Sequence, residues 1–125
     1  MTEQRPPVEA LDFRILAEYE QMSPGLAAEL TSMFLDDVPG RLEALRAALR
    51  TGDLRAVGHL SHTLKGTSSN LGAGHLAAIC GDLQIEAEGG STAAAAAMLE
   101  SIEQAWEQLK EMLPAAVEAA AGSAG

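Results

Sequence analysis

His62, Lys65 and Gly66 place a nucleophile, a cation and a residue without a side chain in one short segment. Neutral imidazole is a good nucleophile near pH 7, and a phosphoryl group on a ring nitrogen would bring negative charge beside the ammonium group of Lys65. Gly66 costs a helix about 1 kcal/mol relative to alanine, so its presence suggests a need for space, such as room for a partner's active site. This combination of residues would suit a phosphoryl group carried on His62.

The other two histidines lack these neighbours. His59 has the branched Thr63 four residues later, and His75 has alanine and isoleucine where His62 has the cation and the glycine. On a helical wheel of about 100° per residue, His62 lies roughly 150° from the centre of the apolar face of its helix. We therefore expect His62 to be exposed to solvent.

The composition predicts that helices position this segment. The chain has 125 residues, which suits a single domain; 47% of them are hydrophobic and only 3% are aromatic. Abundant alanine and leucine favour packed helices over strands rich in valine, tyrosine and threonine. The fold class is therefore predicted to be all-α.

Apolar residues recur at helical spacing in five stretches, which cover about residues 8–22, 26–49, 54–71, 76–87 and 92–113. Asp53 is expected to cap the third helix, and Ser91 or Thr92 the fifth. Pro39 is expected to kink the second helix without dividing it, whereas Pro114 is expected to end the fifth helix near residue 113.

These helices most economically form an up-and-down antiparallel four-helix bundle, with the short N-terminal helix lying across one end. Residues 8–113 would make up this domain. Residues 1–7, which include two prolines, are expected to be a disordered lead, and residues 114–125 a flexible tail rich in alanine and glycine.

Charge and composition exclude several classes of partner. Eighteen acidic residues against eight basic ones give a net charge of −10, which repels nucleic acid. Cys80 is the single cysteine and cannot form an intrachain disulfide, and the N-terminal stretch has no apolar run typical of a signal peptide. No apolar stretch approaches the roughly 20 residues that cross a bilayer. We therefore expect a cytoplasmic protein with no nucleic-acid or membrane partner.

The segment His62–Gly72, HTLKGTSSNLG, closely resembles the signature of histidine-containing phosphotransfer (HPt) domains. The resemblance covers about residues 11–89 and includes the segments 34–39, 41–45, 52–53 and 76–83. It implies a phosphorylated His62, a supporting Lys65, a small residue at Gly66 and a polar residue on the following helix, where Gln84 stands. On a helical wheel, Gln84 lies at the flank of the buried seam, from where its amide could hydrogen-bond the imidazole or a phosphoryl oxygen.

The resemblance also implies a relay role in a two-component phosphorelay, with response-regulator receiver domains and a hybrid sensor histidine kinase as partners. A ring nitrogen of His62, Nε2 in our expectation, would attack a receiver's aspartyl phosphate in line and later pass the group to another receiver aspartate. The sequence has neither a glycine-rich nucleotide loop nor a Walker-type lysine. We therefore expect a monomeric phosphocarrier without cofactor or autonomous kinase activity, whose partner holds any Mg²⁺.

Basic residues concentrate next to the presumed site. Five of the eight fall between positions 41 and 65, where only two acids occur: Arg41, Arg46, Arg50, Arg55 and Lys65. A basic side would suit the acidic active site of a receiver domain, although ordinary surface charge explains the pattern equally well. The residues expected to contact a partner are Arg55, Gly58, His59, Ser69 and Ile85.

Four other interpretations compete with the relay. A scaffold that binds receivers without being phosphorylated would function without His62, and replacing this residue by glutamine separates the two hypotheses. An enzyme with a small-molecule substrate needs more converging polar groups than this bundle offers. His59 and His62 supply at most two metal ligands, so no metal site is expected. Phosphorylation or nucleophilic chemistry at Thr67, Ser68 and Ser69 would need a paired base, which the sequence does not show. Small residues there more simply allow close packing of the helices.

Overall fold

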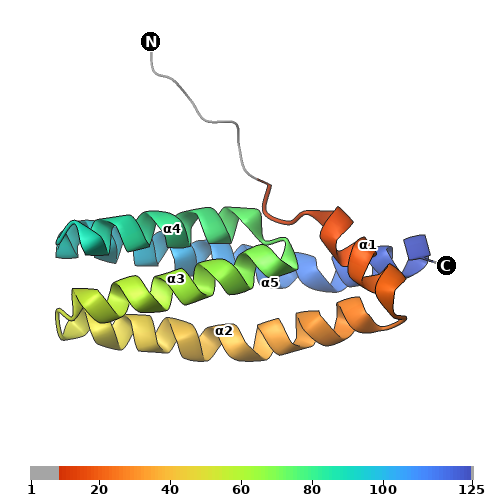
Figure 1. Cartoon of the computed structure of the whole chain (residues 1–125), viewed down its shortest axis with the longest axis horizontal. Coiled ribbons are helices and arrows are strands. Elements are labelled where there is room, and N and C mark those ends of the chain that lie inside the picture. Colours follow the sequence, from red (N-terminus) through yellow and green to blue (C-terminus); the bar gives the residue numbers. More distant parts are fainter. Residues whose placement is uncertain (1–8, 125) are drawn as a thin grey trace, which may run out of the picture.

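The computed structural model describes residues 9–124, and within them the secondary structure is entirely helical. The helices are α1 (Phe13–Met22), α2 (Leu26–Arg50), α3 (Leu54–Leu71), α4 (Gly74–Glu88) and α5 (Thr92–Ala124). Helices α2 to α5 run up and down as an antiparallel bundle (Figure 1). The predicted all-α class and four-helix bundle are therefore confirmed.

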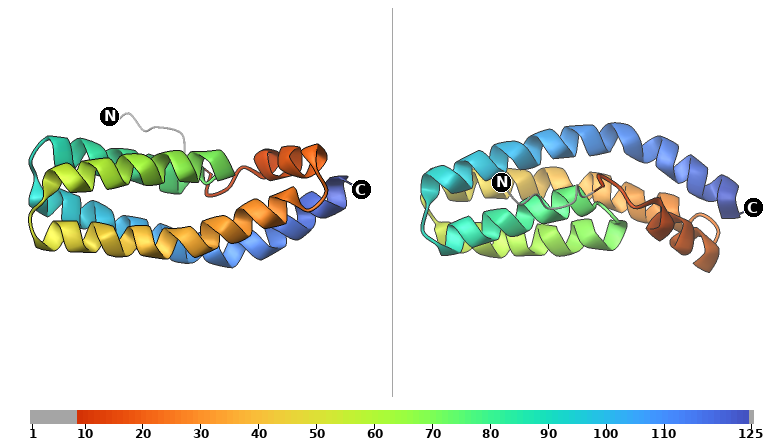
Figure 2. Two further views of the ribbon diagram at one scale, coloured as in Figure 1. Left: turned by 60° about the horizontal axis from the view of Figure 1, so that its bottom comes forward. Right: turned by 90° about the horizontal axis from the view of Figure 1, so that it is seen from above.

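Helix α1 occupies the end of the bundle where α2 begins and α5 ends (Figure 2). Helices α3 and α4 are shorter than α2 and α5, so they leave the far parts of those two helices uncovered. Helix α1 packs against α5 and α2 there. The additional N-terminal helix thus completes the apolar core beyond the ends of α3 and α4.

Local hydrogen bonds explain where the helices begin. The side chain of Asp53 accepts a bond from the backbone N–H of Ala56 at 3.1 Å, and Ser91 accepts one from Ala94 at 3.2 Å. Both predicted caps are therefore present, and each satisfies a backbone donor that the first helical turn leaves free.

The first helix begins later than predicted, at Phe13. Asp12 caps it by accepting a bond from the N–H of Arg14, and residues 9–12 precede it without helical structure. Two backbone hydrogen bonds instead join this segment to the turn after α3 and to the first turn of α4, from Asp12 N to Gly72 O at 2.8 Å and from His75 N to Glu9 O at 3.1 Å. Val8 and the predicted lead of residues 1–7 lie outside the described residues.

The prediction that the last helix ends near residue 113 and that residues 114–125 form a flexible tail is wrong, because α5 continues to Ala124. Pro114 lies inside the helix and is exposed to solvent, and α5 visibly bends along its length (Figure 2). Ala116 and Ala120 beyond it are buried. Packing of α1 on this part of α5 offsets the hydrogen bond that proline removes. Pro39 likewise lies inside an unbroken α2, as predicted.

One apolar core fixes α3 and α4 against each other and against α5. The largest buried side chains include Leu45, Leu64, Leu83 and Ile102, and the rings of Phe34 and Trp106 meet edge to face with centroids 5.5 Å apart. This core sets the outer faces of α3 and α4 side by side. Within residues 9–124, no helix combines the length and apolar character needed to cross a membrane.

Candidate functional site

His62 lies on the outer face of α3 and is exposed, as its position on the helical wheel predicts. Nδ1 of its ring is 3.2 Å from Oε1 of Gln84, 22 residues later on α4. Leu64 on α3 and Leu83 on α4 are fully buried and anchor the two helices below this contact. The structure therefore brings together the two side chains that the sequence placed on neighbouring helices.

Glu88 extends this contact into a chain of three side chains. Nε2 of Gln84 donates a hydrogen bond to Oε2 of Glu88 at 3.2 Å. The sequence pattern did not single out Glu88, although its spacing of four residues from Gln84 puts both on one face of α4. Imidazole, amide and carboxylate thus form a linear hydrogen-bonded array across α3 and α4.

Lys65 extends from α3 over the backbone of α4 at Gly81. A Cβ atom at Gly81 would come within 3.6 Å of Cδ, Cε and Nζ of Lys65. Within residues 9–124, Lys65 forms no salt bridge, so its charge is available to an incoming anion. Gly81 is a second feature that the sequence pattern did not single out, because only the packing of the two helices reveals what lies above it.

Gly66 faces open space. A Cβ atom at this position would meet nothing within 4 Å. The absence of a side chain at Gly66 is therefore not required by the packing of this chain itself. This observation fits the expectation that the space serves another molecule.

A shallow hollow of about 590 Å³ opens beside His62. It is lined by Leu54, Arg55, Gly58, His59, His62, Gln84, Ala87 and Glu88. Three of the residues expected to contact a partner, Arg55, Gly58 and His59, thus share a surface with His62. Ser69 and Ile85 lie outside the hollow, and both are exposed, with 64% of Ile85 accessible to solvent.

The predicted basic side has fewer uncompensated charges than the sequence indicated. Arg41 pairs with Asp37, and Arg46 pairs with Glu43 at 2.9 Å and with Glu103 at 2.6 Å. Ion pairs therefore compensate these two charges. Among the residues that the structure describes, Arg50, Arg55 and Lys65 form no salt bridge. Of these three, Arg55 lines the hollow beside His62, and Lys65 lies one helical turn away from it.

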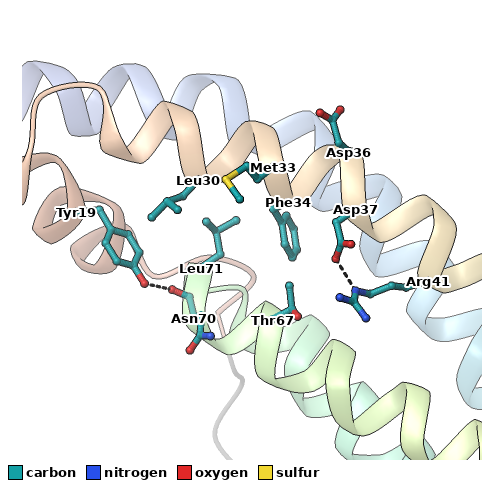
Figure 3. A pocket seen from close by; sticks show the side chains of 10 residues that line it. All are labelled: Tyr19, Leu30, Met33, Phe34, Asp36, Asp37, Arg41, Thr67, Asn70 and Leu71. Atoms are coloured by element: carbon teal, nitrogen blue, oxygen red, sulfur yellow. Dashed lines mark hydrogen bonds and ion pairs between the residues drawn. The ribbon is translucent and has the colours of Figure 1, made fainter.

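A second hollow, of about 760 Å³, lies between α1, α2 and α3 and contains no histidine (Figure 3). Two pairs of its lining residues are bonded to each other: the hydroxyl of Tyr19 donates to the carbonyl oxygen of Asn70 at 2.6 Å, and Arg41 pairs with Asp37. Its other walls are mainly apolar, including Leu30, Met33, Phe34 and Leu71. This hollow therefore offers no imidazole, and its two side-chain hydroxyl groups are engaged in hydrogen bonds.

Three other nucleophilic side chains, those of Cys80, Ser68 and Thr67, are poorly placed for chemistry. Cys80 is buried, and burial raises the pKa of its thiol to about 12, so it is uncharged near neutral pH. Ser68 is fully buried, and Thr67 donates its hydroxyl to the carbonyl oxygen of Thr63. Within residues 9–124, no three His, Cys, Asp or Glu side chains form a group that could hold a metal ion.

The bundle thus presents an accessible imidazole on its surface. An amide bonds to this imidazole, and an ammonium group lies one helical turn away, so the site is a nucleophile exposed on a helical bundle. The family model described as "Hpt domain" matches residues 29–119. The chain therefore belongs to the HPt domain family.

The fold is also similar to the crystal structure of histidine-containing phosphotransfer protein B (HptB) from Pseudomonas aeruginosa PAO1. The two share 32% sequence identity, the match covers 90% of this chain and 97% of that chain, and the TM-score is 0.83. A comparison with curated proteins gives no match.

Proposed function

We propose that this protein carries a phosphoryl group on His62 between the aspartates of receiver domains in a two-component phosphorelay. Membership of the HPt family supports this function. The hydrogen bond between His62 and Gln84 is the observation that supports His62 as the phosphorylated residue. The expected partners are response-regulator receiver domains and a hybrid sensor histidine kinase. The scaffold hypothesis gives no account of the hydrogen bond between His62 and Gln84.

The hydrogen bond between His62 and Gln84 favours one ring nitrogen as the nucleophile. Oε1 of Gln84 can only accept, so a hydrogen bond at this contact requires the proton on Nδ1 of His62, which leaves the lone pair of Nε2 free in the neutral ring. Nε2 attacks the phosphorus of an aspartyl phosphate in line, the N–P bond forms, and the P–O bond breaks to release the aspartate carboxylate. The proton stays on Nδ1, and the ring carries the positive charge. Attack by a second receiver aspartate reverses these changes.

Lys65 and Gly66 are proposed to support the transfer from opposite sides. The free ammonium group of Lys65 stabilises the negative charge of the arriving phosphoryl group. The open space at Gly66 admits the rim of the partner's active site. The partner is proposed to hold Mg²⁺ in its acidic site, and the protein is proposed to have no kinase activity of its own. Arg55, Gly58, His59, Ser69 and Ile85 would form the surrounding docking surface.

The test is to mix the purified protein with a phosphorylated receiver domain and to follow the label. The expected label is stable to base and labile to acid, as a phosphorylated imidazole is, and absent from the His62→Gln variant. If several receivers bind the protein yet none transfers label, the scaffold hypothesis replaces this one.

Gly66→Ala should stabilise the fold and slow phosphoryl transfer. Because the new methyl group meets nothing in the free protein, the free energy of unfolding should rise by up to about 1 kcal/mol. The same methyl group would crowd the docked receiver, and overpacking of about 1–3 kcal/mol corresponds to transfer slowed roughly 5- to 150-fold. Thermal unfolding and transfer kinetics check both effects.

The matched control for this variant is Gly40→Ala in α2, where a methyl group also meets nothing within 4 Å. It should stabilise the protein to a similar extent and leave transfer unchanged. Unaltered transfer in Gly66→Ala would contradict the steric role of Gly66.

Gly81→Leu should slow transfer by displacing Lys65. A leucine side chain at this position occupies the space in which Lys65 now lies. We expect transfer to slow roughly ten-fold, near the lower end of what a hydrogen bond to a charged group contributes. Gly81→Ala is the control, since its Cβ makes only ordinary contact at 3.6 Å and should leave the rate close to that of the wild type. Equal rates in all three proteins would argue against a role for Lys65 in transfer.

A further inference from the structure

Glu88 occupies an electrostatically unfavourable place. It is the last residue of α4, where the carbonyl groups of the helix present the negative end of the helix dipole. Within residues 9–124 it forms no salt bridge, and its carboxylate accepts its hydrogen bond from the amide of Gln84. The position of this acid is therefore explained neither by the helix dipole nor by an ion pair.

The carboxylate determines which end of the Gln84 amide faces His62. An ionised carboxylate can only accept hydrogen bonds, so it selects the NH₂ end of the amide, as the 3.2 Å bond from Nε2 to Oε2 shows. The carbonyl end of the amide is then directed at Nδ1 of His62, 3.2 Å away. Because that oxygen can only accept, Nδ1 must carry the ring proton.

Without Glu88, the amide of Gln84 has no such constraint. It could turn end for end and donate from its NH₂ group to Nδ1 of His62, which would leave the ring proton on Nε2. Histidine free in water also prefers to carry its proton on Nε2. An imidazole in that form has no Nε2 lone pair with which to attack phosphorus.

We propose that Glu88 is a positioning residue that holds the amide of Gln84 and, through it, keeps the proton of His62 on Nδ1. This inference rests on the proposed phosphotransfer function and adds a residue to its machinery. Glu88 touches neither the phosphorus nor the imidazole. During the transfer, the N–P bond forms at Nε2, the P–O bond to the aspartate breaks, and the proton stays on Nδ1, hydrogen-bonded to Oε1 of Gln84.

The position of the proton can be measured on the protein alone. Nitrogen NMR of the imidazole at about pH 8.5, two units above the ordinary histidine pKa, distinguishes protonated from unprotonated ring nitrogens. We expect the proton of His62 to reside mainly on Nδ1 in the wild type and to move toward Nε2 in Glu88→Ala. Transfer from a phosphorylated receiver should slow roughly five-fold, the contribution of one ordinary hydrogen bond.

Two variants serve as comparisons. Glu86→Ala removes the same charge from the same helix at a position without a side-chain bond to Gln84, and it should behave as the wild type does. Glu88→Gln keeps the shape of the side chain but can also donate, so it should give intermediate values of both measurements.

A double variant tests whether Glu88 acts through Gln84. If it does, adding Glu88→Ala to Gln84→Ala should not slow transfer further, because the group that Glu88 orients is already gone. Additive effects, an unchanged proton position in Glu88→Ala, or faster transfer in that variant would each overturn the inference. Its failure is distinct from failure of the proposed function, in which the wild type itself would accept no label.

Discussion

Replacing His62 by glutamine is expected to abolish phosphoryl acceptance, with a loss of at least about a thousand-fold in rate. A side-chain amide has no lone pair comparable to that of an imidazole nitrogen, so the variant has nothing to attack phosphorus with. The fold should not change, because His62 is exposed and the core packs below it. The free energy of unfolding should therefore stay within about 0.5 kcal/mol of the wild-type value. Transfer of label from a phosphorylated receiver is the measurement.

His59→Gln and His75→Gln are the controls for this experiment. Both histidines are exposed, so both are chemically available. His75 lies outside the hollow beside His62, and His75→Gln should transfer at the wild-type rate. His59 lines that hollow, so His59→Gln should still accept label, with an effect confined to docking. An acid-labile label that persists in His62→Gln would place the phosphoryl group on another histidine.

The biological function of His62→Gln, measured together with its receiver binding, separates the phosphocarrier from the scaffold. The exposed surface around position 62, including Arg55 and Ile85, is unchanged in the variant. We therefore expect the variant to bind a receiver domain about as well as the wild type while relaying nothing. A scaffold, by contrast, would retain its biological function in the variant.

The resemblance to HPt domains implied the roles of His62 and Gln84, and the helical period explains why their positions on the two helices could be predicted. Each residue is placed by its angle to the apolar stripe of its own helix, and α3 and α4 are joined by a short turn that makes them neighbours. Glu88 and Gly81 are different. The role of each depends on which side chain of α3 lies opposite, and that is decided by the packing of the core, not by a local pattern.

Pro114 shows how tertiary packing overrides a local signal. Proline in a helix interior removes a hydrogen bond and clashes with the preceding turn, which costs about 3 kcal/mol or more. From the sequence alone, this cost predicts that the helix ends near residue 113. The burial of Ala116 and Ala120 beyond it could not be predicted, because the helix that covers them is 90 or more residues away in the sequence. Leu99, Ile102 and Leu109 on the same helix are buried, as the helical spacing of its apolar residues predicts.

Leu83→Ala is expected to destabilise the protein more than any substitution of an exposed site residue does. Leu83 is fully buried on α4, directly before Gln84. Truncating a buried leucine leaves a cavity and costs about 2–5 kcal/mol, out of a total of roughly 5–15 kcal/mol for an ordinary domain. The midpoint of urea unfolding should fall accordingly, with an unchanged slope if the unfolding remains two-state.

Ile85→Ala is the matched control, because it truncates a neighbouring aliphatic side chain on the same helix. With 64% of Ile85 exposed, its loss should change the free energy of unfolding by no more than about 0.5 kcal/mol. If Ile85 belongs to the docking surface, this variant should slow transfer, whereas Leu83→Ala should impair transfer mainly by unfolding or by shifting Gln84. Equal stability of the two variants would show that Leu83 does not fill the core below the His62–Gln84 contact, and the positions of both side chains would then need to be reconsidered.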